Sequence, residues 1–124
     1  MSTIKYLQIY SDADGCSHFK TLIIDLKPND YAPPATPLNT SIPAAAEASL
    51  FLELPAGWYG DWHPTPVRQW LIIMTGECEF AVGDGERCRR KSGDVVMLDD
   101  TTGKGHCTLV IGDVPVRIAA IHFS

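Results

Sequence analysis

The stretch GWYGDWHPTPVRQWLIIMTG, residues 57–76, decides the fold of this 124-residue chain. Five residues separate Gly57 from His63, Thr65 and Gln69 follow, and six residues separate Gln69 from Gly76. Spaced polar side chains thus lead into a short apolar run that ends at a glycine turn. Apolar segments of this length between turn residues favour β-strands over helices.

A second stretch, GDVVMLDDTTGKGH at residues 93–106, combines a glycine turn, a short apolar run and a histidine. Val95–Leu98 predicts a buried strand, and His106–Ile111 predicts the next one. Between them, the acidic and hydroxyl side chains of residues 99–102 can tie a polar loop to its own backbone. Glycines at positions 103 and 105 let this loop bend just before His106.

The rest of the chain follows the same pattern of short strands and tight turns. Further strands are predicted at Ile4–Tyr10, Phe19–Leu26, Ser49–Leu54, Glu77–Val82, Glu86–Arg90 and Val114–Phe123. We expect one all-β domain over residues 1–124, with N-terminal strands in 1–27, a Pro-rich arm in 28–43 and a barrel core in 50–123. The arm is interpreted as a connecting loop, with a lid or a dimer contact as alternatives.

The two quoted stretches resemble the cupin superfamily. Its first motif is Gly, five residues, His-x-His, a short gap, Glu, six residues and Gly, and here Thr65 replaces the second His and Gln69 replaces the Glu. Its second motif corresponds to Gly93-Asp94 and, after a longer turn than usual, His106. The resemblance implies a jelly-roll β-barrel, a homodimer, and a ligand site inside the barrel mouth.

In metal-binding cupins these motifs supply three His ligands and one Glu. The resemblance implies the same set here, but only two of its positions are matched, by His63 and His106. A Gln69 amide oxygen is a weaker ligand than a carboxylate, and catalytic zinc or iron sites normally use three protein ligands. Asp61 lies two residues before His63, so on a strand both side chains would face the same way. The alternative hypothesis is an oxygenase-like site in which Fe, Mn, Zn or Ni is bound by Asp61, His63 and His106.

The leading hypothesis uses the same residues without a cofactor. Imidazoles titrate near neutral pH, so His63 and His106 can act as acid and base, as in an isomerase, lyase or cyclase. Gln69 would bind a substrate carbonyl or enolate oxygen, and Thr65 would orient a water or a ring nitrogen. A third hypothesis keeps the cavity as a metabolite-binding site without turnover.

Neighbouring residues have two interpretations each. Trp58, Tyr59 and Trp62 form either an aromatic rim for a planar ligand or a packed barrel end. Strand alternation directs Gln69 inward and Arg68 outward, where an ion pair with Asp99 or Asp100 is expected.

Composition and charge exclude several classes of function. Net charge is −5, which argues against nucleic-acid binding, and the basic run at residues 87–91 is interpreted as a solvated hairpin edge. No apolar run reaches the roughly 20 residues of a membrane helix, and residues 1–9 lack a signal-peptide pattern. We therefore expect a cytoplasmic protein, in whose reducing compartment the four widely spaced cysteines are free thiols. The expected partner is a small molecule.

Overall fold

Short β-branched and apolar runs between glycine turns give a molecule built from strands. The computed structural model describes residues 2–124. Its strands are β1 (Ser2–Ser11), β2 (Ser17–Asn29), β3 (Leu38–Thr40), β4 (Ala48–Leu54), β5 (Tyr59–His63), β6 (Gln69–Thr75), β7 (Glu77–Ala81), β8 (Arg87–Lys91), β9 (Val95–Asp99), β10 (His106–Ile111) and β11 (Val116–His122). Within residues 2–124 no helix is long and apolar enough to span a membrane.

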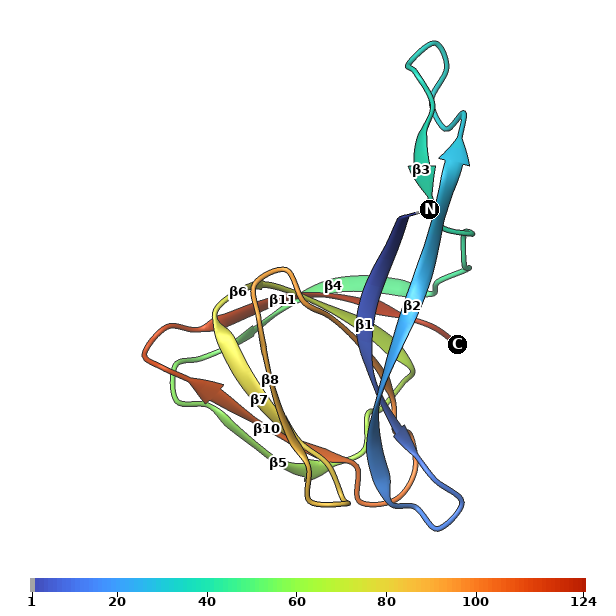
Figure 1. Cartoon of the computed structure of the whole chain (residues 1–124). Coiled ribbons are helices and arrows are strands. Elements are labelled where there is room, and N and C mark those ends of the chain that lie inside the picture. Colours follow the sequence, from blue (N-terminus) through green and yellow to red (C-terminus); the bar gives the residue numbers. More distant parts are fainter. Residues whose placement is uncertain (1) are drawn as a thin grey trace.

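The strands form two sheets that face each other around a barrel interior (Figure 1). The larger sheet has the order β3-β2-β1-β9-β6-β11-β4, and the smaller one has the order β5-β10-β7-β8. The pairing of β1 with β9 is parallel, whereas the other strand pairs are antiparallel. The all-β, single-domain jelly-roll prediction is confirmed.

Alternation along β6 separates the interior of the barrel from its outer surface. Gln69, Leu71 and Ile73 are buried, whereas the residues between them are half-buried on the opposite side. This matches the predicted direction of Gln69. The apolar core includes Ile9, Ile73, Phe80, Val96, Val116 and Ile118, which come from both sheets.

The Pro-rich arm differs from the predicted connecting loop. Strand β2 continues through Pro28 to Asn29, and β3 pairs back with it, so that a two-stranded hairpin extends beyond the barrel (Figure 1). No residue between 28 and 43 lines the barrel cavity described below. In this structure the arm is therefore not a lid over His63.

The basic run at residues 87–91 is strand β8, at the edge of the smaller sheet. Arg87 and Arg89 both lie near the Glu79 carboxylate on β7, with N–O distances of 3.2 and 3.6 Å. Exposed ion pairs of this kind contribute little to stability. The interpretation as a solvated hairpin edge is confirmed.

Candidate functional site

The barrel encloses a cavity of about 140 Å³ whose walls come from both sheets. Most of its lining is apolar, with Leu71 and Phe80 among the residues that form it. Its polar lining consists of His63, Thr65, Gln69, His106 and Thr108. Four of these five are residues that the sequence predicted for the site.

His106 is held by a carboxylate that lies deeper in the protein. The Nδ1 atom of His106 lies 2.6 Å from Oδ2 of Asp100, and the two side chains are 3% and 0% exposed. Nδ1 donates its proton to the carboxylate, which leaves Nε2 as the ring nitrogen available to a ligand. Asp100 therefore fixes both the tautomer and the orientation of the His106 ring.

His63 faces His106 because β5 and β10 pair in a register that places the two residues opposite each other. Their ring centroids are 4.9 Å apart. Nδ1 of His63 lies 2.6 Å from the backbone carbonyl of Asp61. A carbonyl only accepts, so Nδ1 carries the proton and Nε2 of His63 is unprotonated in the neutral ring. His63 is exposed, which places it at the mouth of the cavity.

Thr65 and Gln69 form a buried hydrogen-bond chain in the cavity wall. The Thr65 hydroxyl donates to the carbonyl of Val67 at 2.7 Å, so its oxygen accepts from Nε2 of Gln69 at 3.1 Å. This order fixes the Gln69 amide, because the hydroxyl proton is already used. Oε1 of Gln69 is buried and has no hydrogen-bond partner. The unpaired atom of Gln69 is therefore an acceptor, whereas the predicted contact with a substrate carbonyl would use the second N–H of Nε2.

The structure does not bring Asp61 to the two histidines. The Asp61 carboxylate accepts from the backbone N–H of Trp62 at 2.8 Å, and the residue is not part of the cavity lining. Within residues 2–124 the single cluster of three or more His, Cys, Asp or Glu ligand atoms with metal-binding spacing lies elsewhere. Two imidazoles and an amide oxygen do not fit a tightly bound transition metal in this cavity.

Of the three predicted aromatic residues, only Trp58 lines the cavity. Its ring packs on Gly60, where any Cβ atom would overlap it. Tyr59 is 52% exposed, and the Trp62 ring lies under the Lys104 ammonium group at 4.4 Å. A continuous aromatic rim is therefore not formed.

The sequence interpretation missed the role of Asp100. It placed this residue in a loop or beside Arg68, but Arg68 pairs with Asp99 at 2.6 Å, whereas Asp100 turns inward to His106. The available signal was an adjacent pair of acidic residues at the end of a buried strand. One of the two must face inward if the chain continues in extended form.

Comparison with known proteins supports the fold. No protein-family model matches the chain, and no curated protein matches it. The cupin domain of Schizosaccharomyces pombe Cnp3 is similar in structure, with a TM-score of 0.55 and 16% identity over 97% of this chain and 87% of that one. A Cupin 2 conserved barrel domain protein from Salinispora arenicola gives a TM-score of 0.52 and 22% identity, covering 80% of this chain and 76% of that one. The chain has a cupin-type barrel fold, as its sequence motifs indicated.

Proposed function

We propose that the barrel cavity is an active site in which His106 and His63 move protons on a small organic substrate, in a reaction of the isomerase, lyase or cyclase type. The observation that carries this proposal is the fully buried Asp100–His106 pair at the cavity wall. A carboxylate behind an imidazole orients the ring and stabilises the imidazolium that forms when the ring takes a proton.

The proton transfers follow from the two tautomers. Nε2 of His106 takes a proton from a substrate C–H or O–H group, and the Asp100 carboxylate stabilises the resulting positive charge. The electron pair left on the substrate shifts into a new double bond or displaces a leaving group. His63, once protonated from solvent at the mouth, returns a proton to the substrate or to the leaving group. Catalysis of this kind contributes typically ~10²–10⁴-fold.

The cavity restricts the size and polarity of the substrate. Its volume of about 140 Å³ is close to that of an engineered cavity of roughly 150 Å³ that holds benzene. The reacting part of the substrate therefore has about six non-hydrogen atoms, and any larger portion must extend past His63. Because Oε1 of Gln69 lacks a donor, the substrate should present a hydroxyl or N–H group to it.

The test is hydrogen–deuterium exchange at carbon, followed by NMR in D₂O. The probes are small hydroxy-ketones and hydroxy-acids of about six non-hydrogen atoms, a size set by the cavity. We expect the wild-type chain to exchange a proton of at least one probe, and we expect His106→Gln to lower that rate by about 10²-fold or more. His122→Gln is the matched control, since His122 lies on β11 and does not line the cavity.

Asp100→Asn separates a positioning role from a structural one. We expect slower exchange together with a changed tautomer of His106, read from its ¹⁵N ring shifts. Normal exchange with an altered tautomer would remove Asp100 from the mechanism.

A binding role without turnover is the second candidate, and the unpartnered Gln69 oxygen is equally consistent with it. If the probes raise the melting temperature in a manner that depends on Gln69, yet no probe exchanges hydrogen, the binding role replaces the catalytic one. A cytoplasmic location stays a prediction from the sequence.

A further inference from the structure

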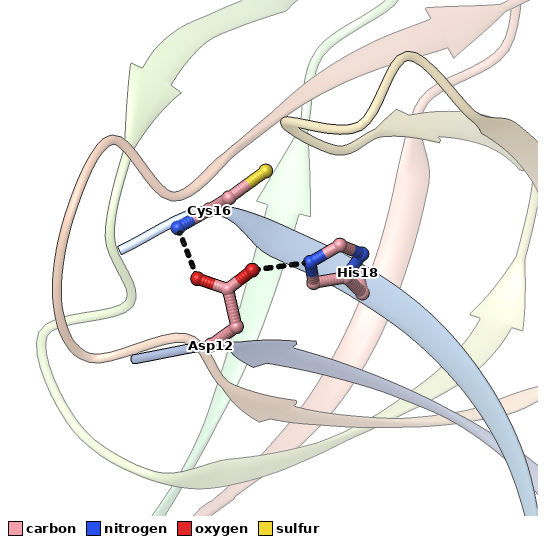
Figure 2. A group of neighbouring side chains, drawn as sticks. All are labelled: Asp12, Cys16 and His18. Atoms are coloured by element: carbon pink, nitrogen blue, oxygen red, sulfur yellow. Dashed lines mark hydrogen bonds and ion pairs between the residues drawn. The ribbon is translucent and has the colours of Figure 1, made fainter. Parts of the chain in front are cut away.

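A second group of chemically reactive side chains lies outside the barrel cavity, at the turn between β1 and β2. Asp12, Cys16 and His18 each carry a potential metal-binding atom at this turn. Figure 2 shows the Asp12 carboxylate beside the His18 ring and the Cys16 backbone N–H, with the Cys16 sulfur pointing away from the carboxylate. The potential metal-binding atoms all lie within 4.8 Å of one another, and all three residues are half-buried. They supply a carboxylate oxygen, a thiol sulfur and an imidazole nitrogen.

The turn sequence fixes the carboxylate of this group. Oδ1 of Asp12 accepts from the backbone N–H groups of Asp14 and Cys16, at 2.9 and 3.0 Å. Gly15 adopts a φ of +82°, which closes the turn and brings Cys16 back beside Asp12. The other oxygen, Oδ2, is left to face Nε2 of His18 at 2.7 Å. The thiol of Cys16 makes only a long contact of 3.8 Å, to the carbonyl of Ser17.

A fourth residue orients the imidazole from another turn. Oδ2 of Asp84, between β7 and β8, accepts from Nδ1 of His18 at 2.9 Å. Metal-binding histidines typically donate their second ring nitrogen to a carboxylate in this way, which fixes the ring and raises its basicity. Nε2 is therefore the nitrogen presented to Asp12 and Cys16.

We propose that Asp12, Cys16 and His18 bind one divalent zinc-type cation, with Asp84 as the carboxylate that supports His18. A borderline-soft ion that accepts tetrahedral coordination suits a mixed set of sulfur, nitrogen and oxygen ligands, with water as the fourth. Bond lengths of about 2.0–2.3 Å place tetrahedral ligand atoms roughly 3.3–3.8 Å apart. When the cation binds, the distance between the Asp12 oxygen and the His18 nitrogen must therefore increase slightly. The larger distances between the other ligand atoms must decrease.

Binding replaces protons with the metal. The hydrogen bonds that His18 donates to the carboxylates of Asp12 and Asp84 raise the pKa of His18 above its ordinary value. The cation displaces the proton between Asp12 and His18 and the thiol proton of Cys16, and both are released to solvent. Titrations should therefore be carried out in mildly alkaline buffer.

The position of this cluster gives the cation a structural role. Ser17, between two of the ligands, donates to the carbonyl of Gly105 at 2.7 Å and accepts from the backbone N–H of Gly83 at 2.8 Å. Ser11 donates to the carbonyl of Thr102 at 2.8 Å. The β1–β2 turn is thus fastened to the loop that precedes β10. A cation here should stiffen this end of the barrel and raise its melting temperature.

The experiment titrates the chelator-stripped full chain with Co²⁺ and then with competing Zn²⁺. We expect one Co²⁺ to bind per chain and to give a near-ultraviolet thiolate-to-cobalt absorption band. The visible bands should be as intense as those of tetrahedral Co²⁺, and added Zn²⁺ should abolish them. Cys16→Ser should remove the thiolate band. Asp84→Asn should keep the stoichiometry and weaken binding by about 10- to 100-fold. Cys88→Ser is the matched control, because Cys88 is also half-buried but lies on β8, outside the cluster.

Two outcomes would overturn the proposal. One is the absence of stoichiometric uptake by the wild-type chain, which would leave the cluster as an ion-paired turn. The other is uptake that survives Cys16→Ser but is lost in His63→Ala, which would place the metal in the barrel. Neither outcome depends on the proton-transfer assay, since the cluster and the cavity share no residue.

Discussion

Two buried oxygens, Oδ1 of Asp100 and Oε1 of Gln69, lack hydrogen-bond partners, and within the described chain they are the only buried side-chain atoms of this kind. Leaving such an atom unpaired costs about 1–3 kcal/mol. Gln69 lines the cavity, and Asp100 lies behind the cavity wall, where it supports His106. The protein therefore gives up stability at the place where we propose that a ligand binds, which is typical of functional sites.

Cys78 on β7 provides a pH-dependent prediction that is independent of both sites. Burial, followed by the nearby charges of Glu77 and Asp94, raises the pKa of this thiol from an ordinary 9.0 to about 12. Between these two values the folded chain keeps a proton that the unfolded chain loses. Stability should therefore fall as pH rises through this range, by at most about 1.4 kcal/mol per pH unit.

The measurement compares urea unfolding at several alkaline pH values for the wild-type chain and Cys78→Ala. The variant is less stable overall because it leaves a cavity, but its stability should fall less steeply with pH. In the folded wild-type chain a thiol reagent should modify the half-buried Cys16 and Cys88 well before Cys78. Equal slopes for the two proteins, or rapid modification of Cys78, would contradict the assigned pKa.

At the scale of single residues, the motif frame predicted His63, Thr65, Gln69 and His106 correctly as neighbours in the barrel. It could not predict the hydrogen bonds that decide their chemistry. The free atom of Gln69 depends on the direction of the Thr65 hydroxyl, and Asp100 reaches His106 only through the path of the loop between them. Both contacts depend on the tertiary fold, and no periodic pattern in the sequence indicates them.

At the scale of elements, the turn before β10 controls how the two histidines meet. Gly105 has a φ of +77°, and a Cβ atom there would overlap the backbone carbonyl of His63. The glycine thus lets the loop approach the end of β5, directly before the residue that pairs with His63. Gly112 has a similar φ of +82° but open space around it.

A matched pair of variants, Gly105→Ala and Gly112→Ala, separates the cost of backbone strain from the cost of disturbing the contact between the loop and β5. Each should cost about 1–2 kcal/mol for the left-handed conformation. Gly105→Ala should cost more, because β5 and the loop must also move apart, and it should weaken binding of any cavity ligand. Chemical denaturation measures the difference. Equal losses of stability for the two variants would show that the approach of Gly105 to His63 is unimportant.

The strands that the sequence predicted include those with a clear apolar run, such as β6 and β9. It missed β5 and β3. Strand β5 contains Gly60, which is weak in a strand by itself and is accommodated here because the Trp58 ring covers it. Strand β3 lies within the Pro-rich arm, and its only partner is the extended end of β2. Pairings of this kind depend on distant segments, so local composition cannot reveal them.

At the scale of the whole molecule, the spacing of glycines and histidines indicated the fold. The same spacing did not indicate which part of the outer surface is apolar. The outward face of β6, with Trp70 and Ile72, joins the base of the arm to line a groove of about 840 Å³. Ile42, at the edge of this groove, is 90% exposed, and Ile23 is 55% exposed. Contiguous apolar surface of this kind is typical of an interface between proteins.

We propose that, in the predicted homodimer, a second copy of the chain covers this groove. The projecting hairpin and the groove that it borders belong to the same chain, so a two-fold axis would let each arm cover the other copy. Ile42→Asp should therefore shift the chain toward monomer in sedimentation velocity, because a carboxylate buried in an apolar groove is unfavourable. Val114→Asp is the control, since Val114 is 53% exposed in the β10–β11 turn and does not line the groove. A wild-type chain that sediments as a monomer at high concentration, or a dimer that Ile42→Asp leaves intact, would exclude this surface as the dimer interface.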